Sequence, residues 1–371
     1  MVASITSLPP ELIHEILAQP VLTQSDHLNL TKVCKQLHSF ARQYTSPADG
    51  AITLYANNFA QLTSFIRRLL CPFDGADFAT DFHDVTIEWG SKNARHRRYT
   101  TEVKEKLMWT EEELKRLAEV YEKFKFREGW RKSIEQFIDP ATLLIPIICL
   151  LTKIEELAMG VPNGRVDDEG KYINHIDEFF EGLVSGEGKD NVGDVDVLLA
   201  DYPPSLLNLK TFRRGHYNDE LGFGIYEVMA IFLIPGIVTI ALDTCAGDFD
   251  WMDRFIAEGW ECPVKCIEFS TAEIINEEIV KFVQNCECLK SVDISLYPIN
   301  WGIIEDFDEC EEKFSIGIMS QAVTKWHGNS LQYGMIRAER DEWWFRRTPS
   351  GKRKSGGKTG WISAESDEDA Y

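Results

Sequence analysis

The sequence predicts an α/β protein in which a small helical module precedes a long array of short parallel strands, each backed by helices. Two observations lead to this fold class. An apolar pattern recurs through residues 51–335, with apolar side chains at a first position and again three and five residues later. Apolar residues at helical spacing lie between these short motifs and also within residues 1–46.

Two helices are predicted within residues 1–46. Pro9 and Pro10 suit the first turn of a helix that Pro20 ends, and Ser25 or Asp26 can cap a second helix. Each helix has an apolar face, formed by Leu12, Ile13, Ile16 and Leu17 in the first and by Leu30, Val33, Cys34, Leu37, Phe40 and Ala41 in the second. A unit this short cannot bury both faces by itself, so either the rest of the chain or another protein has to cover them.

The order of residues in this module resembles the F-box. The matching residues are Leu8-Pro9-Pro10-Glu11-Leu12, Ile16-Leu17, Asp26, Leu28, Leu30 and Val33-Cys34-Lys35. The stretch from Ala18 to Ser25 is slightly longer than the usual link between the two helices, and Leu37 stands where many F-boxes carry Trp or Phe.

This resemblance implies a function in ubiquitin transfer. An F-box binds the Skp adaptor of the Skp/cullin/F-box (SCF) E3 ubiquitin ligase, and the rest of the chain binds the client protein that is ubiquitylated. The residues that would contact the adaptor are Leu8, Pro9, Leu12, Ile16, Leu17, Leu28, Leu30, Val33 and Cys34. The resemblance therefore implies a non-catalytic substrate receptor that reaches a cullin through the adaptor. An adaptor-bound scaffold that never meets the cullin is the alternative.

Beyond Gly50 the apolar pattern recurs in six copies. Five are complete and one, the fourth from the end, is poorer: Phe82-Val85-Ile87, Ile154-Leu157-Met159, Leu209-Phe212, Ile237-Ile240-Leu242, Val264-Ile267-Phe269 and Leu289-Val292-Ile294. The last four begin 28, 27 and 25 residues apart. This spacing matches the leucine-rich repeat, in which each unit gives one short strand and one returning helix. Because the asparagine expected after the strand is missing, we predict an irregular leucine-rich-repeat-like solenoid.

Helices and loops are predicted between and beyond these strands. Thr110 to Glu113 form a capping box ahead of an amphipathic helix. The acidic, glycine-rich stretch at residues 184–196 is expected to be a solvated insertion. Residues 346–371 carry basic side chains first and acidic side chains from Glu365 to Asp369, and we expect them to form a disordered charged tail.

The predicted strands imply a candidate client-binding surface. Side chains two, four and six positions after each first apolar residue should point away from the helices. Of these eighteen positions six are acidic and one is basic; the charged residues are Asp84, Glu88, Glu156, Arg213, Asp243, Glu268 and Asp293. Because small side chains lie between the carboxylates, a basic segment of the client is the expected ligand.

The composition argues against several other classes of function. A net charge of -21 argues against binding of nucleic acid or anionic lipid by electrostatics alone. The apolar runs 141–151 and 228–242 are shorter than the ~20 residues of a membrane-spanning helix. The nine cysteines and the absence of a signal-peptide pattern in residues 1–10 predict reduced thiols in the cytoplasm or nucleus. No catalytic residue, cofactor or metal site is predicted, because the motifs for a zinc protease, a zinc site and a phosphate-binding loop are all incomplete.

Overall fold

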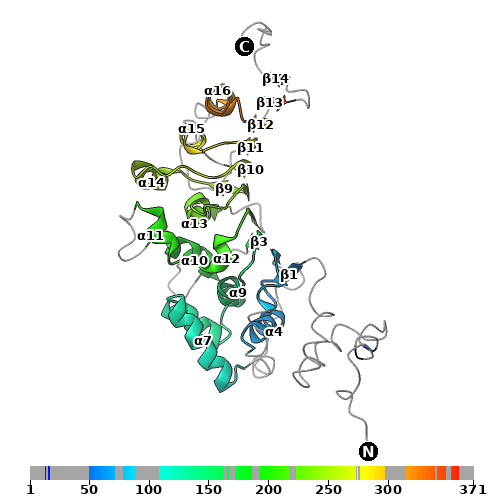
Figure 1. The fold of residues 1–371 in the computed structure, drawn as a ribbon, viewed down its shortest axis with the longest axis vertical. Coiled ribbons are helices and arrows are strands. Elements are labelled where there is room, and N and C mark those ends of the chain that lie inside the picture. Colours follow the sequence, from blue (N-terminus) through cyan, green and yellow to red (C-terminus); the bar gives the residue numbers. More distant parts are fainter. Residues whose placement is uncertain are drawn as a thin grey trace, which may run out of the picture.

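The computed structural model describes Ile13, Ile16 and residues 50–71, 78–88, 108–161, 165–166, 172–185, 193–216, 223–272, 274, 276–296, 315–338, 341–347 and 352–358. Within these residues the chain is a mixed α/β protein. One large, mostly parallel sheet runs along the molecule, and helices flank it on one side (Figure 1).

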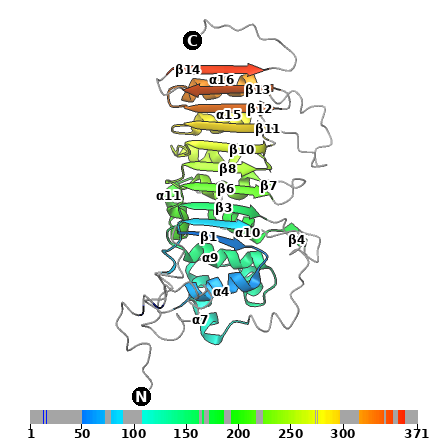
Figure 2. The same cartoon turned by 90° about the vertical axis from the view of Figure 1, so that its right-hand side faces the viewer.

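The large sheet has ten strands, and their order in space, β1-β2-β3-β6-β8-β10-β11-β12-β13-β14, follows their order in the chain (Figure 2). Neighbours from β1 to β12 pair in parallel, whereas β13 and β14 are antiparallel. The strands are β1 (Ala51–Tyr55), β2 (Asp84–Glu88), β3 (Glu156–Val161), β6 (Thr211–His216), β8 (Thr239–Asp243), β10 (Cys266–Ala272), β11 (Ser291–Leu296), β12 (Tyr333–Ala338), β13 (Asp341–Arg347) and β14 (Arg353–Lys358). Two small sheets pair β4 (Arg165–Val166) with β5 (Tyr172–Ile173), and β7 (Phe223–Gly224) with β9 (Cys245–Ala246).

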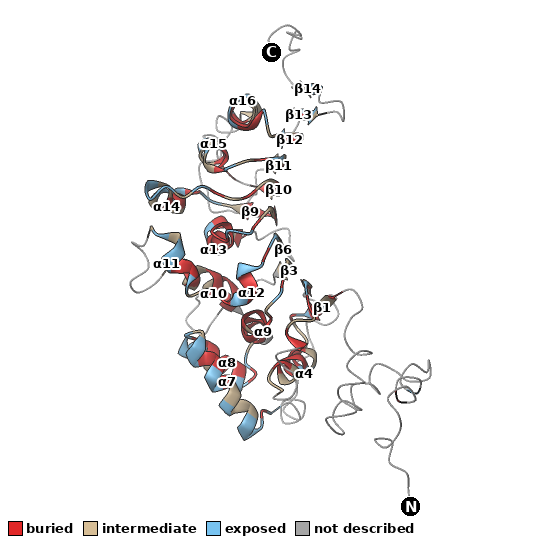
Figure 3. Cartoon of the chain, in the orientation of Figure 1, coloured by how far each residue is buried: buried red, intermediate tan, exposed pale blue. Residues whose placement is uncertain are grey.

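Helices and short 3₁₀ turns connect the strands of the large sheet. They are α4 (Phe59–Leu69), α7 (Glu111–Lys123), α8 (Glu128–Glu135), η4 (Pro140–Leu143), α9 (Leu144–Leu150), α10 (His175–Val184), α11 (Val195–Leu199), α12 (Pro204–Leu207), η5 (Ile225–Val228), α13 (Met229–Phe232), η6 (Asp250–Met252), α14 (Asp253–Ala257), α15 (Asn276–Asn285) and α16 (Ile316–His327). Helices α9 and α13 are largely buried, while α7 and α14 expose part of their surface (Figure 3).

The recurring apolar pattern places equivalent side chains opposite one another on six neighbouring strands. In register these residues are Val85, Leu157, Phe212, Ile240, Ile267 and Val292. All six are buried. Burying one large apolar side chain contributes roughly 1.5–3 kcal/mol, so this row is a major part of what holds the sheet to its helices. The six strands expected from the pattern are confirmed.

The poorer copy of the pattern has a charged residue in the core. Arg214 occupies the third apolar position of β6 and is 2% exposed. Its guanidinium lies 2.6 Å from a carboxylate oxygen of Asp177 on α10 and 3.0 Å from one of Glu227 on η5, and it stacks over the ring of Phe223. Burial raises the pKa of Asp177 well above its usual range, although Arg214 acts in the opposite direction. A buried charge needs such partners, because its desolvation is otherwise very costly.

The capping box predicted at the start of α7 is confirmed. The backbone N–H of Thr110 donates to a carboxylate oxygen of Glu113 at 2.8 Å, and the N–H of Glu113 donates to the hydroxyl of Thr110 at 3.2 Å. These two bonds satisfy backbone donors that a helix start leaves unpaired. The helix then buries Leu117, Val120 and Tyr121 against its neighbours.

Two expectations about loops are corrected. The tail expected at residues 346–371 is ordered at residues 353–358, which form β14 against β13. Residues 359–371 lie outside the described residues. The insertion expected at residues 184–196 is narrower than predicted, because Val184 still belongs to α10 and α11 already begins at Val195. Residues 186–192 lie outside the described part of the chain.

Candidate functional site

The side of the large sheet that faces away from the helices is the candidate binding surface, and we call it the open face (Figure 2). Along β2, β8, β11 and the first five residues of β10, half-buried or exposed side chains alternate with buried ones, as expected for a sheet covered on one side. All seven charged residues predicted for client binding lie on this face, and none of them is buried: Asp84, Glu88, Glu156, Arg213, Asp243, Glu268 and Asp293.

Two carboxylates lie side by side at the N-terminal end of the open face. Asp84 on β2 and Glu156 on β3 are directly opposite in the strand register. Among the described residues neither has a cationic partner, whereas the adjacent Glu155 binds Lys210 at 2.7 Å, which lowers the pKa of Glu155. Like charges directly opposite each other destabilise a sheet. Within the described part of the chain, no cation offsets the repulsion between the carboxylates of this acidic pair, Asp84 and Glu156.

The acidic residues in the middle of the open face are neutralised within the chain. Arg213 on β6 reaches across Ala241 on β8 to bind Glu268 on β10 at 2.9 Å. Arg337 on β12 binds Asp293 on β11 at 3.0 Å. The small side chain between the first two residues leaves room for the long arginine. Glu268 and Asp293 are thus less available to a basic ligand than the sequence suggested.

The remaining two predicted residues lie at the ends of their strands. Glu88 is exposed at the end of β2, opposite Tyr55 of β1. Asp243 is half-buried at the end of β8, opposite Ser270. Only Glu88 belongs to the same end of the face as the acidic pair, so the acidic surface that can meet a basic ligand is concentrated on β2 and β3.

Three strands that the apolar pattern did not predict extend the open face with a different chemistry. Trp344 on β13 is 37% exposed, and its ring lies over Gly356 of β14, where a Cβ would be only 2.8 Å from the ring. Beside it, Arg346 and Lys354 are directly opposite in register, exposed, and without an acidic partner among the described residues. We call these two residues the cationic pair. The aromatic run at 343–345 is typical of a strand and could have indicated this part of the site.

The predicted adaptor-binding residues are almost entirely beyond what the structure describes. Leu8, Pro9, Leu12, Leu17, Leu28, Leu30, Val33 and Cys34 lie outside the described residues. Ile16 is helical and 38% exposed, and Ile13, on the predicted apolar face of the same helix, is helical and buried. A contact between Ile16 and another protein is compatible with this exposure.

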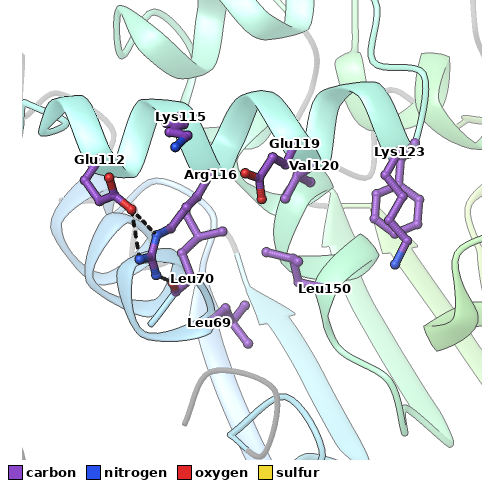
Figure 4. Close-up of a pocket in the computed structure, with 10 residues that line it drawn as sticks. Leu69, Leu70, Glu112, Lys115, Arg116, Glu119, Val120, Lys123 and Leu150 are labelled. Atoms are coloured by element: carbon purple, nitrogen blue, oxygen red, sulfur yellow. Dashed lines mark hydrogen bonds and ion pairs between the residues drawn. The ribbon is translucent and has the colours of Figure 1, made fainter. Parts of the chain in front are cut away.

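A shallow hollow of about 440 Å³ lies between α4, α7 and α9 (Figure 4). Leu69, Val120 and Leu150 contribute apolar side chains to its walls, and the guanidinium of Arg116 at its rim is held by Glu112 and by the carbonyl of Leu70. Because Arg116 and Glu112 bond to each other and the apolar groups belong to helix packing, the hollow offers no convergent set of groups for a ligand.

Other kinds of site find little support in the described part of the chain. It holds no group of three or more His, Cys, Asp or Glu residues placed to bind a metal ion. Cys262 and Cys286 face each other across an isolated bridge as buried free thiols, and burial raises the pKa of Cys286 well above its usual range. None of the described helices is both long and apolar enough to cross a membrane.

Comparison with known proteins adds no relative. No model of a known protein family matches the chain, and no curated protein matches it at a significant level. The resemblance to the F-box therefore rests on residues 8–35 themselves, and the open face has to be interpreted from its own chemistry.

Proposed function

We propose that this chain is the substrate-recognition subunit of an SCF E3 ubiquitin ligase. Residues 1–46 bind the Skp adaptor, and residues 51–335 form a leucine-rich-repeat-like solenoid whose open face binds the client. The observation that carries the client-binding half is the acidic pair on β2 and β3, which has no cationic partner among the described residues. The adaptor-binding half rests on the resemblance of residues 8–35 to the F-box.

The order of the strands supports the solenoid. Each parallel strand lies beside the next one in the sequence, with helical segments on the same side each time (Figure 1). Repeated units that touch only their neighbours produce this arrangement, and they leave one long face of strands available for binding. A protein ligand can then contact many strands at once, which suits a receptor.

The acidic pair favours a client that presents Lys or Arg. A cation placed between Asp84 and Glu156 would form charge-assisted hydrogen bonds, each worth roughly 1.5–3 kcal/mol. The same cation would also remove the repulsion between the two carboxylates. A cation would therefore bind most strongly at the acidic pair, which lacks a cationic partner among the described residues. For this reason we place the client there rather than at Glu268, which already forms an ion pair with Arg213.

A pull-down with purified proteins tests the adaptor-binding half. We expect wild-type protein to retain the Skp adaptor and, through it, the cullin. The double substitution Leu12→Ala with Ile16→Ala should abolish both, because each large apolar side chain buried at such a contact contributes roughly 1.5–3 kcal/mol.

The matched control truncates two apolar side chains that are exposed elsewhere, Val197→Ala with Leu207→Ala. It should retain adaptor and cullin at wild-type levels. Recovery of the adaptor by the Leu12/Ile16 variant would refute the assigned roles. Recovery of the adaptor without the cullin by the wild-type chain would favour the scaffold alternative.

A further inference from the structure

One row of residues on the open face crosses the large sheet from β2 to β14. Its members are cross-strand neighbours, each directly opposite the next in the strand register: Asp84, Glu156, Thr211, Thr239, Cys266, Ser291, Tyr333, Arg346 and Lys354. None of them is buried. We call this set the cross-strand row, and it runs across the stacked strands rather than along any one of them (Figure 2).

The two ends of the cross-strand row carry opposite charge. The acidic pair, Asp84 and Glu156, lies on β2 and β3, and the cationic pair, Arg346 and Lys354, lies on β13 and β14. Like charges directly opposite each other destabilise a sheet, and neither pair has an oppositely charged partner among the described residues. A ligand that brought the opposite charge to each end would remove both repulsions.

Protection of the sheet edge does not account for the cationic pair. A lysine on an edge strand discourages pairing with other strands, and Lys354 on β14 suits that role. Arg346 lies on β13, one strand further in, where β12 and β14 already pair with both sides. The presence of two opposed cations therefore requires another explanation.

The middle of the cross-strand row is uncharged. Its members on β6, β8, β10 and β11 all have small side chains: Thr211, Thr239, Cys266 and Ser291. Beside them on the open face lie the two ion pairs already described, whose charges are neutralised within the chain. Along the row, the charges that lack a partner among the described residues thus lie only at its two ends.

We propose that the client segment on the open face is bipolar: it lies extended along the cross-strand row, with Lys or Arg at the acidic pair and Asp or Glu at the cationic pair. This inference rests on the proposed client-binding role of the open face and adds the second half of the ligand's chemistry. Trp344, which is 37% exposed beside the cationic pair, offers apolar contact to a side chain next to the acidic residues of the client.

The net charge of the chain explains why both charges should belong to one ligand. An acidic ligand by itself is repelled by a chain of net charge -21. Once the basic end of a bipolar segment is bound, the acidic end stays near the cationic pair at an effective concentration on the order of millimolar. The first contact therefore favours the second.

The geometry of the sheet sets the spacing between the two charged ends of the client. The centre of the acidic pair and the centre of the cationic pair are seven strand spacings apart, which corresponds to about 34 Å. An extended chain advances about 3.4 Å per residue, so about ten residues separate the two ends. Charges only about four residues apart span roughly 13 Å and reach one pair at a time.

Fluorescence anisotropy with the full chain at low salt tests this spacing. Two labelled peptides have the same composition, two lysines and two glutamates in a chain of glycine and serine. Lysines and glutamates are about ten residues apart in the long-spaced peptide and about four apart in the short-spaced peptide. We expect the long-spaced peptide to bind about tenfold tighter, because only this peptide contacts both pairs at once. Salt at about 0.5 M should remove the difference, because it screens exposed charges.

Substitutions identify the second contact. Arg346→Gln with Lys354→Gln should abolish the tenfold difference between the peptides. The matched control, Lys115→Gln with Lys132→Gln, removes the same charge from exposed positions on α7 and α8 and should keep the difference. Thermal melts followed by circular dichroism report whether each variant is folded. A tenfold difference that survives in the Arg346/Lys354 variant would overturn the proposal.

The same titrations separate this inference from the proposed function. Asp84→Asn with Glu156→Gln should weaken the binding of both peptides. If it does, but the wild type binds the two peptides equally, the bipolar ligand is refuted and the acidic pair remains the client site. If the Asp84/Glu156 variant binds both peptides as tightly as the wild type, the proposed client site is refuted, and the bipolar ligand with it.

The chain's own carboxylates at residues 365–369 are the competing occupant of the cationic pair, and they lie outside the described residues. Glu365→Gln with Asp367→Asn should leave the tenfold difference unchanged. A difference that appears only in this variant would assign the cationic pair to the chain itself and would overturn the proposal.

A zero-length carbodiimide reagent checks the orientation of the long-spaced peptide, because it joins a lysine to a carboxylate only where the two are in contact. We expect the glutamates of the peptide to be linked to Lys354, and its lysines to Asp84 or Glu156. Links to Lys115 or Lys132 in comparable yield would contradict the assigned position of the ligand.

Discussion

Neutralising one member of the acidic pair should stabilise the fold while it weakens binding. Side chains directly opposite on neighbouring strands have Cβ atoms about 5 Å apart. Two unit charges at that distance repel by about 0.8 kcal/mol in water, and measured cross-strand pairs differ by roughly 0.2–1 kcal/mol. Because Asp84 and Glu156 have no cationic partner among the described residues, Glu156→Gln should raise the free energy of unfolding by about 0.5 kcal/mol.

Urea unfolding followed by circular dichroism measures this difference, and a second carboxylate on the same face provides the comparison. Glu268 binds Arg213, so Glu268→Gln should lower the free energy of unfolding by roughly 0.2–1 kcal/mol. The two substitutions remove the same charge from the same face and should have effects of opposite sign. A loss of stability in Glu156→Gln, or equal effects in both variants, would refute the interpretation of the acidic pair.

Binding of a basic ligand should weaken when the charges of the acidic pair are reversed. With a fluorescently labelled Lys/Arg-rich peptide as the probe, Asp84→Lys with Glu156→Lys should weaken binding at least about tenfold, or 1.4 kcal/mol. The matched control, Glu119→Lys with Glu128→Lys on exposed helical positions, makes the same change in net charge. An equal loss in both variants would mean that the peptide responds to total charge alone.

Four further predictions concern the core. Arg214→Ala should lower the free energy of unfolding by about 3–5 kcal/mol in chemical denaturation, because it leaves the buried carboxyl group of Asp177 and the half-buried one of Glu227 without their cation. Burial raises the pKa of Asp177 in the folded state, so the folded chain binds a proton that the unfolded chain releases. The free energy of unfolding should therefore fall as the pH rises from about 3.8 toward that higher pKa. The substitution Asp177→Asn should flatten this dependence on pH. Burial lowers the pKa of His327, whose Nδ1 accepts the N–H of Leu289. The free energy of unfolding should therefore fall as the pH drops below 6.5. Thermal melts of His327→Asn should lack this loss of stability at low pH. Gly334→Val should cost about 1–3 kcal/mol in urea unfolding, because the new side chain would collide with the ring of Trp343.

The sequence predicted the strands whose inward side chains follow the apolar pattern. It missed strands in which a residue that is not apolar stands at one of the positions of the pattern. In β12, Gly334 lies in register with Val292, and a Cβ there would be 2.8 Å from the ring of Trp343. The space that a valine fills in other strands is thus filled by an aromatic ring from β13. In β1, Asp49 stands three residues before Ile52, where the pattern requires an apolar side chain.

The sequence predicted which residues lie on the open face but not which of them form ion pairs. Alternation along each strand is a local property, so the open-face positions follow from the pattern alone. The ion pair of Arg213 with Glu268 joins residues 55 positions apart and depends on the small Ala241 between their strands. Such a contact requires knowledge of which strands are neighbours and in which register. The cationic pair was missed for the same reason, because β13 and β14 reverse direction and leave the repeat.

Quantitative affinity purification from cells with a blocked proteasome tests the central claim most directly, by comparing the full chain with the chain lacking residues 1–45. We predict that the deletion removes the Skp adaptor and the cullin together. Proteins captured through the open face should remain, and they should be lost on Asp84→Lys with Glu156→Lys while adaptor and cullin stay. Retention of the cullin by the shortened chain, or its absence from the full chain, would contradict a role as a ubiquitin-ligase receptor.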